Sequence, residues 1–142
     1  IAGIYGLERE QSRKNAAELM KVFGLEEVWN KKAKTLSGGY QRKVSIAMAL
    51  ITDPKILYLD EPTLGLDVLS RRELWRAIDA LKGKVTIVLT THYMEEAEAL
   101  SDRIAIMVKG RKVEEGTMEE LRKKTGKERL EDIFVSIVEE MQ

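Results

Sequence analysis

The sequence predicts an α/β fold in which short strands of a parallel sheet alternate with amphipathic helices. Residues 55–59 are a short apolar run of the kind that a buried parallel strand uses. Residues 85–90, rich in β-branched residues, and residues 103–108 are predicted to be a second and a third strand. Helical patterns separate these runs, and such alternation is typical of α/β folds. The 142 residues suffice for one domain with a hydrophobic core, and an apolar content of 44% argues against disorder.

Six segments are predicted to be helices: residues 11–23, 39–52, 68–81, 94–100, 118–124 and 129–141. In the second of these, Val44, Ala47, Met48 and Ile51 form one apolar face. The last has the clearest amphipathic pattern, with Leu130, Ile133, Phe134, Ile137, Val138 and Met141 at helical spacing.

Punctuating residues set the limits of these elements. Gly24 ends the first helix and Pro54 ends the second. A turn at residues 109–110 leads to a fourth short strand at 111–115. Thr117 then caps a helix, with Glu120 three residues on, as a capping box requires. We expect a helical subdomain over 1–53, an α/β core over 54–125 and a C-terminal amphipathic helix over 126–142.

Bulk composition excludes several classes of protein. Lys+Arg and Asp+Glu both number 24, so overall charge does not favour nucleic-acid binding. Cysteine is absent, which excludes disulfides and cysteine metal sites. No apolar run reaches the roughly 18 residues of a membrane span, and no signal peptide is recognisable. The simplest expected location is the cytosol.

Two acids follow the first predicted strand. Asp60 and Glu61 lie at its carboxyl end, which is where open α/β sheets place ligands. A carboxylate there can hold a hydrated magnesium ion, and its neighbour can orient or deprotonate a water molecule. The alternative is a loop entry with two solvated acids.

Ser37, Gly38 and Gly39 open the second helix. The N–H groups at a helix N-terminus attract anions such as phosphate, and glycines let the backbone approach a ligand closely. Taken singly, these residues also fit a plain helix cap. By the same reasoning Asp67 alone fits a helix cap, and His92, the only histidine, fits a packing or surface residue.

Taken together and in this order, the motifs resemble those of the ATP-binding-cassette (ABC) ATPase family over nearly the whole chain. Residues 36–39 match the signature motif, and residues 56–61 match the Walker B strand with its following glutamate. Residues 66–67 match the D-loop, and His92 matches the switch histidine. The segment 110–121 is also typical, and the chain looks most like the ATPases of ABC-2-type and drug exporters. Tyr40 replaces the usual glutamine of the signature, and Gln41 follows it.

The resemblance implies the C-terminal part of a P-loop NTPase (RecA-like) parallel sheet with an α-helical subdomain and an incomplete core. Two such subunits sandwich two ATP molecules head to tail. Ser37, Gly38, Gly39 and Gln41 would then bind, in trans, the nucleotide that the opposite subunit holds.

The remaining motif residues receive roles in the same way. By resemblance, Asp60 would hold Mg²⁺ through water and Glu61 would be the general base. His92 would contact the γ-phosphate, and Asp67 would cross the dimer interface and couple the two sites.

One family element is missing from the sequence. A P-loop has the form G-x-x-x-x-G-K-[ST], and neither Gly-Lys pair, at 83–84 or 126–127, fits it. Together with Ile1 as first residue, this indicates a fragment. We expect the intact parent to hydrolyse ATP and the isolated chain to be inactive, so enzyme status stays open for the chain itself. Removing the P-loop strand would leave unpaired sheet edges, so the fragment should rearrange or pair with a second copy.

The leading functional expectation is the ATPase subunit of a membrane exporter. Such a subunit would act as a homodimer on transmembrane transporter subunits, peripheral to the inner face of the cell membrane, with no nucleic-acid partner. Two alternatives stay open: a non-transport ABC-family ATPase of the translation or DNA-repair type, and a non-catalytic dimerisation module. Against the former, the sequence has no coiled-coil arm, zinc motif or basic patch.

Overall fold

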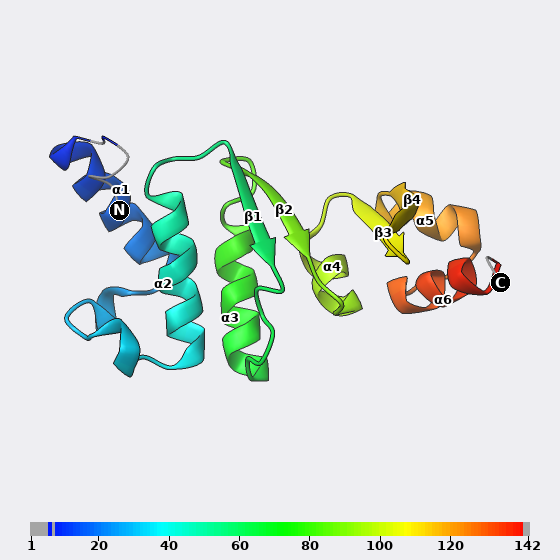
Figure 1. The fold of residues 1–142 in the computed structure, drawn as a ribbon, viewed down its shortest axis with the longest axis horizontal. Helices are drawn as coiled ribbons and strands as arrows, with labels where there is room; N and C mark the ends of the chain where they lie inside the picture. The colour runs from blue at the N-terminus through cyan, green and yellow to red at the C-terminus, as the bar shows by residue number, and fades with distance from the viewer. Residues whose placement is uncertain (1–5, 7, 141–142) are drawn as a thin grey trace. The chain divides into compact units, whose positions relative to one another are not determined.

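The computed structural model describes residue 6 and residues 8–140. The chain forms two compact units, Ile1–Thr90 and Thr91–Gln142. Their elements are shown in Figure 1. The first unit contains all the predicted site residues except His92.

The first unit consists of helices and a small sheet, in the order α1 (Arg9–Phe23), η1 (Glu26–Val28), η2 (Ala33–Thr35), α2 (Gly38–Leu50), β1 (Ile56–Asp60), α3 (Val68–Asp79) and β2 (Thr86–Thr90). The three α-helices pack against one another. The predicted helices and strands are confirmed, with ends shifted by one or two residues. The two short 3₁₀ helices, η1 and η2, were not predicted.

Strands β1 and β2 pair in parallel, in register from Ile56 with Thr86 to Asp60 with Thr90. Along β1 the side chains alternate between buried and exposed, and Leu57 and Leu59 are the buried ones. This confirms a parallel sheet for the first two predicted strands, whereas the third, at 103–108, pairs antiparallel with the strand that follows it and does not join this sheet. In the described part of the chain the sheet has these two strands only, as expected for an incomplete core.

Helix α1 ends at Gly24, which adopts the left-handed conformation with φ of 60°. The expected apolar face of α2 was only partly right. Met48 is 44% exposed, and it lines, with Val44, Ala47 and Ile51, an apolar pocket of about 240 Å³ between α1 and α2. The buried face is displaced around the helix and consists of Gly39, Lys43, Ile46, Ala47 and Leu50.

The second unit contains α4 (Met94–Leu100), β3 (Ile104–Val108), β4 (Arg111–Gly116), α5 (Met118–Thr125) and α6 (Leu130–Glu140). Strands β3 and β4 form an antiparallel hairpin with a register shift between Ile106 and Met107. The predicted turn joins them, with Lys109 and Gly110 both at positive φ. Residue 141, included in the predicted last helix, lies outside the described residues.

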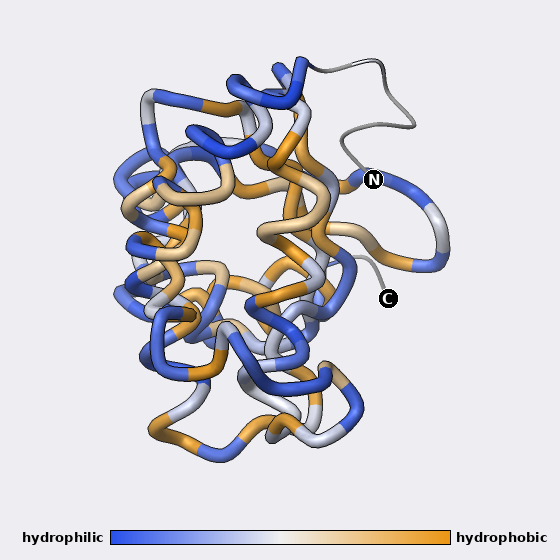
Figure 2. Tube along the Cα trace, turned by 90° about the vertical axis from the view of Figure 1, so that its left-hand side faces the viewer, coloured by the Kyte–Doolittle hydropathy of each residue, from blue (hydrophilic) through white to orange (hydrophobic). Residues whose placement is uncertain are grey.

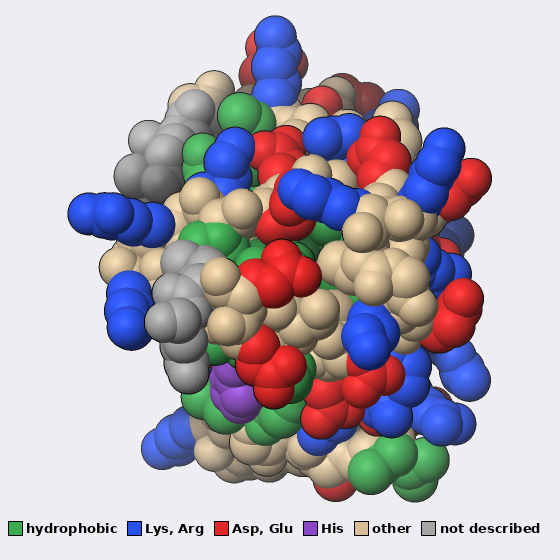
Figure 3. All heavy atoms as spheres, turned by 90° about the vertical axis from the view of Figure 1, so that its right-hand side faces the viewer, with side chains coloured by type: hydrophobic (Ala, Val, Ile, Leu, Met, Phe, Trp, Pro, Cys, Tyr) green, Lys and Arg blue, Asp and Glu red, His purple; other side chains and the backbone are tan. Residues whose placement is uncertain are grey.

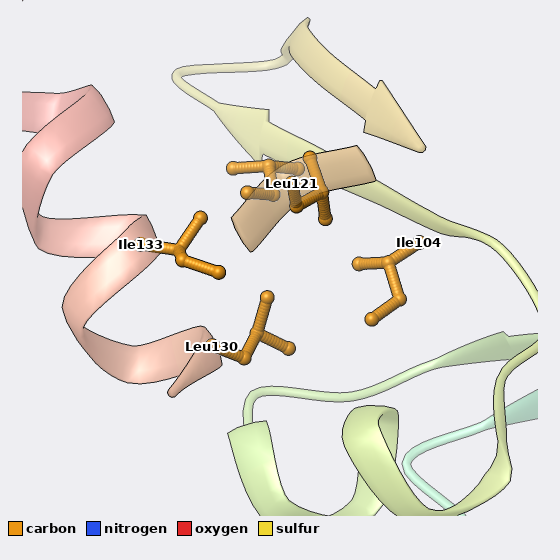
Figure 4. Packing of buried hydrophobic residues seen from close by; sticks show 5 residues of the cluster. Ile104, Leu121, Leu130 and Ile133 are labelled. Atoms are coloured by element: carbon orange, nitrogen blue, oxygen red, sulfur yellow. The ribbon is translucent and has the colours of Figure 1, made fainter. Parts of the chain in front are cut away.

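A hydrophobic cluster holds the second unit together. Ile104, Leu121, Leu130 and Ile133 point toward one another from β3, α5 and α6 (Figure 4). The predicted capping box starts α5: the Thr117 hydroxyl accepts from the Glu120 N–H, and the Glu120 carboxylate accepts from the Thr117 N–H.

Orange apolar and blue polar residues alternate along the helices of Figure 2, as the amphipathic patterns predicted.

Candidate functional site

The signature residues form the start of α2. Ser37 has extended backbone angles, and its hydroxyl oxygen accepts a 3.4 Å hydrogen bond from the Tyr40 N–H. Ser37 is therefore an N-cap, as its residue type allows. Ser37 and Gly38 are exposed. The first N–H groups of a helix have no acceptor within the helix, so this exposed start suits an anion. The Gln41 amide donates to the Leu36 carbonyl at 2.9 Å, which ties the first turn to the preceding residue.

Gly39 differs from Gly38 in being buried. A Cβ at Gly39 would lie 3.0 Å from the Ser70 Oγ and 3.1 Å from the Ser70 Cβ, whereas a Cβ at Gly38 would meet only Leu66, at 3.8 Å. The close approach of α3 therefore favours glycine at position 39, since a Cβ there would need Ser70 to move by a few tenths of an ångström. Sequence reasoning gave both glycines a ligand-binding explanation, and the structure adds a packing explanation for one of them.

Asp67 caps the N-terminus of α3. Its Oδ1 accepts from the N–H groups of Leu69 and Ser70 at 3.0 and 3.1 Å, and its Oδ2 accepts from the Ser70 hydroxyl at 2.6 Å. The Ser70 hydroxyl, followed by the backbone donors, lowers the pKa of Asp67 below its ordinary value of 3.8. Asp67 is thus held as an exposed carboxylate at the N-terminal end of α3.

The two acids lie at the carboxyl end of β1, as predicted. Asp60 is exposed, and its Oδ1 accepts a hydrogen bond from the Thr90 hydroxyl on β2. Glu61 donates its N–H to the Thr90 carbonyl at 2.9 Å. The Glu61 backbone has a φ of 45°, in the left-handed region that non-glycine residues rarely adopt. Strained backbone of this kind concentrates at functional sites.

His92 belongs to the second unit and is exposed. The purple side chain in Figure 3 is the only histidine of the sequence. Its ring lies 4.2 Å, centroid to centroid, from the ring of Tyr93. The Tyr93 N–H donates to the Thr91 hydroxyl at 3.0 Å, in the residues that precede α4.

Sequence reasoning missed an ion pair between α2 and α3. The Lys43 Nζ lies 2.7 Å from the Glu73 Oε2, and 5.2 Å from the centroid of the Tyr40 ring. Lys43 is 7% exposed. The spacing in the sequence could have indicated that Lys43 is buried, because it lies four residues after Gly39 and three before Ile46, on the same face of the helix. Because lysine is charged, this face was not recognised as a buried one.

The donor set at the end of β1 fits a magnesium ion, which keeps several waters and uses one or two carboxylates together with substrate phosphates. One oxygen of the exposed Asp60 carboxylate accepts the hydrogen bond of the Thr90 hydroxyl, and the second oxygen is the one that would face a metal ion. Among the described residues, no group of three or more His, Cys, Asp or Glu side chains forms a metal cage. None of the helices in this part of the chain is long and apolar enough to cross a membrane.

A parallel β pair whose first strand ends in two acids, together with a helix opened by Ser-Gly-Gly, is typical of part of an α/β nucleotide-binding domain. Comparison with known proteins agrees. The family model described as "ABC transporter" matches residues 4–64. A solved ATP-binding subunit of an ABC transporter superimposes with a TM-score of 0.79 at 30% identity, covering 96% of this chain and 58% of that one. A second solved ATP-binding cassette gives a TM-score of 0.73 at 28% identity, covering 88% of this chain and 49% of that one.

Curated relatives give the same result. The chain is 41% identical over 132 residues to the daunorubicin resistance ATP-binding protein DrrA3 of Streptomyces coeruleorubidus, covering 92% of this chain and 42% of the relative. It is 40% identical to the doxorubicin resistance ATP-binding protein DrrA of Mycobacterium tuberculosis, covering 95% of this chain and 40% of that one. It is also 49% identical over 109 residues to the human phospholipid-transporting ATPase ABCA3, covering 77% of this chain and 6% of the relative.

The chain belongs to the ATP-binding-cassette family of ATPases, and it resembles the ABC-2-type and drug-exporter ATPases in particular. It spans about two fifths of the length of the DrrA relatives. The predicted family and fold class are confirmed.

Proposed function

We propose that this chain is part of the ATP-binding and ATP-hydrolysing subunit that powers an ABC membrane exporter. The observation that carries the proposal is the strained Glu61, next to an Asp60 that Thr90 orients, at the carboxyl end of β1. A glutamate whose backbone is strained, in a position where α/β sheets bind ligands, supports a catalytic role. It argues against the alternative of a loop entry with two solvated acids. The likeness to DrrA and ABCA proteins supports the transport role.

In this function the residues of the β1 end act on the phosphates of ATP. Asp60 would hold Mg²⁺ through water, and the ion would neutralise the charge on the β- and γ-phosphates. Glu61 would take the proton of the attacking water. His92 would contact the γ-phosphate.

The residues at the starts of α2 and α3 would act across a homodimer interface. Ser37, Gly38, Gly39 and Gln41 would close over the nucleotide held by the second subunit, with helix N–H groups directed at its γ-phosphate. Because Gly39 is buried against Ser70, Ser37 and Gly38 would make the direct contacts. Asp67 would couple the two sites. The further partners would be transmembrane subunits, which would place the protein at the inner face of the cell membrane.

The chain contains no G-x-x-x-x-G-K-[ST] segment, which in P-loop ATPases supplies the backbone donors and the lysine for the phosphates. The 142 residues therefore contribute the general base and the trans half of the site, without the phosphate cradle. We infer that they do not hydrolyse ATP by themselves.

The test compares Glu61→Gln with the unsubstituted sequence in the P-loop-containing protein that includes this chain. We expect ATP hydrolysis to fall at least about 100-fold, the usual contribution of a general base, while ATP binding persists. An unchanged hydrolysis rate would show that Glu61 is not the base. Magnesium-dependent hydrolysis by the 142-residue chain alone, lost on Glu61→Gln, would refute the inference that the chain needs a P-loop.

A further inference from the structure

Helices α2 and α3 are in close contact at their N-terminal ends, where Gly39 faces Ser70. A Cβ added at Gly39 would lie 3.0 Å from the Ser70 Oγ. Real Cβ atoms do not tolerate such an approach unless the neighbour moves. The backbone at the start of α2 therefore packs directly against Ser70 of α3.

A second contact lies one turn further along both helices. Lys43, four residues after Gly39, forms the 2.7 Å ion pair with Glu73, three residues after Ser70. Residues three and four apart share one face of a helix, so both contacts lie on the same faces of α2 and α3. The side chain of Lys43 is 9% exposed and that of Glu73 is 57% exposed. Two contacts a turn apart fix the rotation of each helix as well as their separation.

Each of these helices begins with a residue of the proposed site. Ser37 caps α2, and Asp67 caps α3. Ser70 takes part in both arrangements, because its hydroxyl donates to Asp67 at 2.6 Å while the same side chain supports Gly39. Gly38 and Leu66 add an ordinary contact, at 3.8 Å from the position of a Gly38 Cβ.

We propose that Ser70, Lys43 and Glu73 are positioning residues that hold Ser37 and Asp67 as one rigid body. A displacement of Asp67 at the dimer interface is then passed through Ser70 and the Lys43–Glu73 pair to the start of α2. This inference rests on the proposed function, since it supplies the link between the coupling residue and the residues that close over ATP in trans.

The first test measures amide hydrogen exchange in the 142-residue chain, in both directions across the helix pair. Glu73→Gln on α3 should speed exchange in the first two turns of α2 by about tenfold, because it removes the charge from a charge-assisted bond. Asp79→Asn is the matched control, because Asp79 pairs at 3.1 Å with Lys82 just past the C-terminal end of the same helix. Gly39→Ala should speed exchange at Leu69 and Ser70, and Gly38→Ala should not.

The second test is kinetic and uses the P-loop-containing protein. The P-loop binds the nucleotide of its own subunit, so Glu73→Gln should leave KM for ATP within about twofold and lower kcat by about tenfold. Asp79→Asn should change neither constant. A purely structural role for the pair would lower thermal stability without this division between kcat and KM.

Each outcome decides one part of the proposal. If Glu73→Gln affects exchange only within α3, or if Asp79→Asn affects α2 equally, the link between the helices is refuted. If the link holds but kcat does not change, the positioning role is refuted. If the unsubstituted P-loop-containing protein lacks ATPase activity, the proposed function fails, and exchange alone then reports on the helix pair.

Discussion

The Thr90 hydroxyl of β2 donates a hydrogen bond to the Oδ1 of Asp60 on β1, between residues that face each other in the parallel register. The bond fixes one carboxylate oxygen and thereby sets the direction of the other. In the proposed function that second oxygen faces the waters of Mg²⁺, so Thr90 orients a metal-holding group without contacting the metal.

Replacing Thr90 with valine should lower the apparent affinity for Mg²⁺ without unfolding the protein. Valine keeps the branched shape and removes the donor, which costs about 1 kcal/mol for an ordinary hydrogen bond. We expect the Mg²⁺ concentration for half-maximal ATPase activity to rise about fivefold in the P-loop-containing protein. Thr86→Val, at the other end of β2, is the control. Equal magnesium curves for the two variants would contradict the orienting role.

Glu61→Gly should stabilise the chain and should abolish ATP hydrolysis in the P-loop-containing protein. Glycine adopts positive φ without the penalty of about 1–2 kcal/mol that other residues incur, so the free energy of unfolding should rise by about 1 kcal/mol. Urea unfolding measures the change. Lys109→Gly, at a φ of 48° in the β3–β4 turn, is a matched control that should also stabilise the chain, and should leave the ATPase activity of the P-loop-containing protein intact. A loss of stability at Glu61→Gly would mean that side-chain contacts of Glu61 outweigh its strain.

The pKa of Asp67 is lowered in the folded protein, chiefly by the Ser70 hydroxyl, and this makes its contribution to stability depend on pH. A depressed folded-state pKa gives a contribution that is complete above the unfolded-state value, near 3.8, and is lost as pH falls through the folded value. Asp67→Asn keeps a good N-cap residue and removes the ionisation. Urea midpoints measured from pH 6 downward should therefore fall less steeply below about pH 4 in this variant. Parallel curves would contradict the assignment.

Strand β2 pairs with β1 on one side, and in the described residues no strand pairs with its other edge. Ile56, Tyr58 and Val88 are exposed on one face of the same pair, at 50%, 73% and 43%. Open edges with apolar neighbours associate readily. We therefore expect the 142-residue chain to self-associate in light scattering, and Val88→Lys to reduce this. Met107→Lys, on β3, should have no such effect. A monodisperse monomer would contradict the expectation.

The sequence by itself determined the order and type of the helices and strands, and the caps at Gly24, Ser37, Asp67 and Thr117. These features follow from local chemistry: apolar periodicity, left-handed glycine, and side chains that accept from nearby N–H groups. The family motifs are equally local, which is why the class of protein could be identified before the fold was known.

Only the tertiary structure decided which residues meet across elements. Lys43 with Glu73 and Asp60 with Thr90 are each separated by 30 positions, and their contact depends on helix rotation and strand register. The burial of Gly39 against Ser70 and the left-handed backbone of Glu61 arise in the same way. Local periodicity does not fix these quantities, because they are set by the packing of α2 on α3 and by the pairing of β1 with β2.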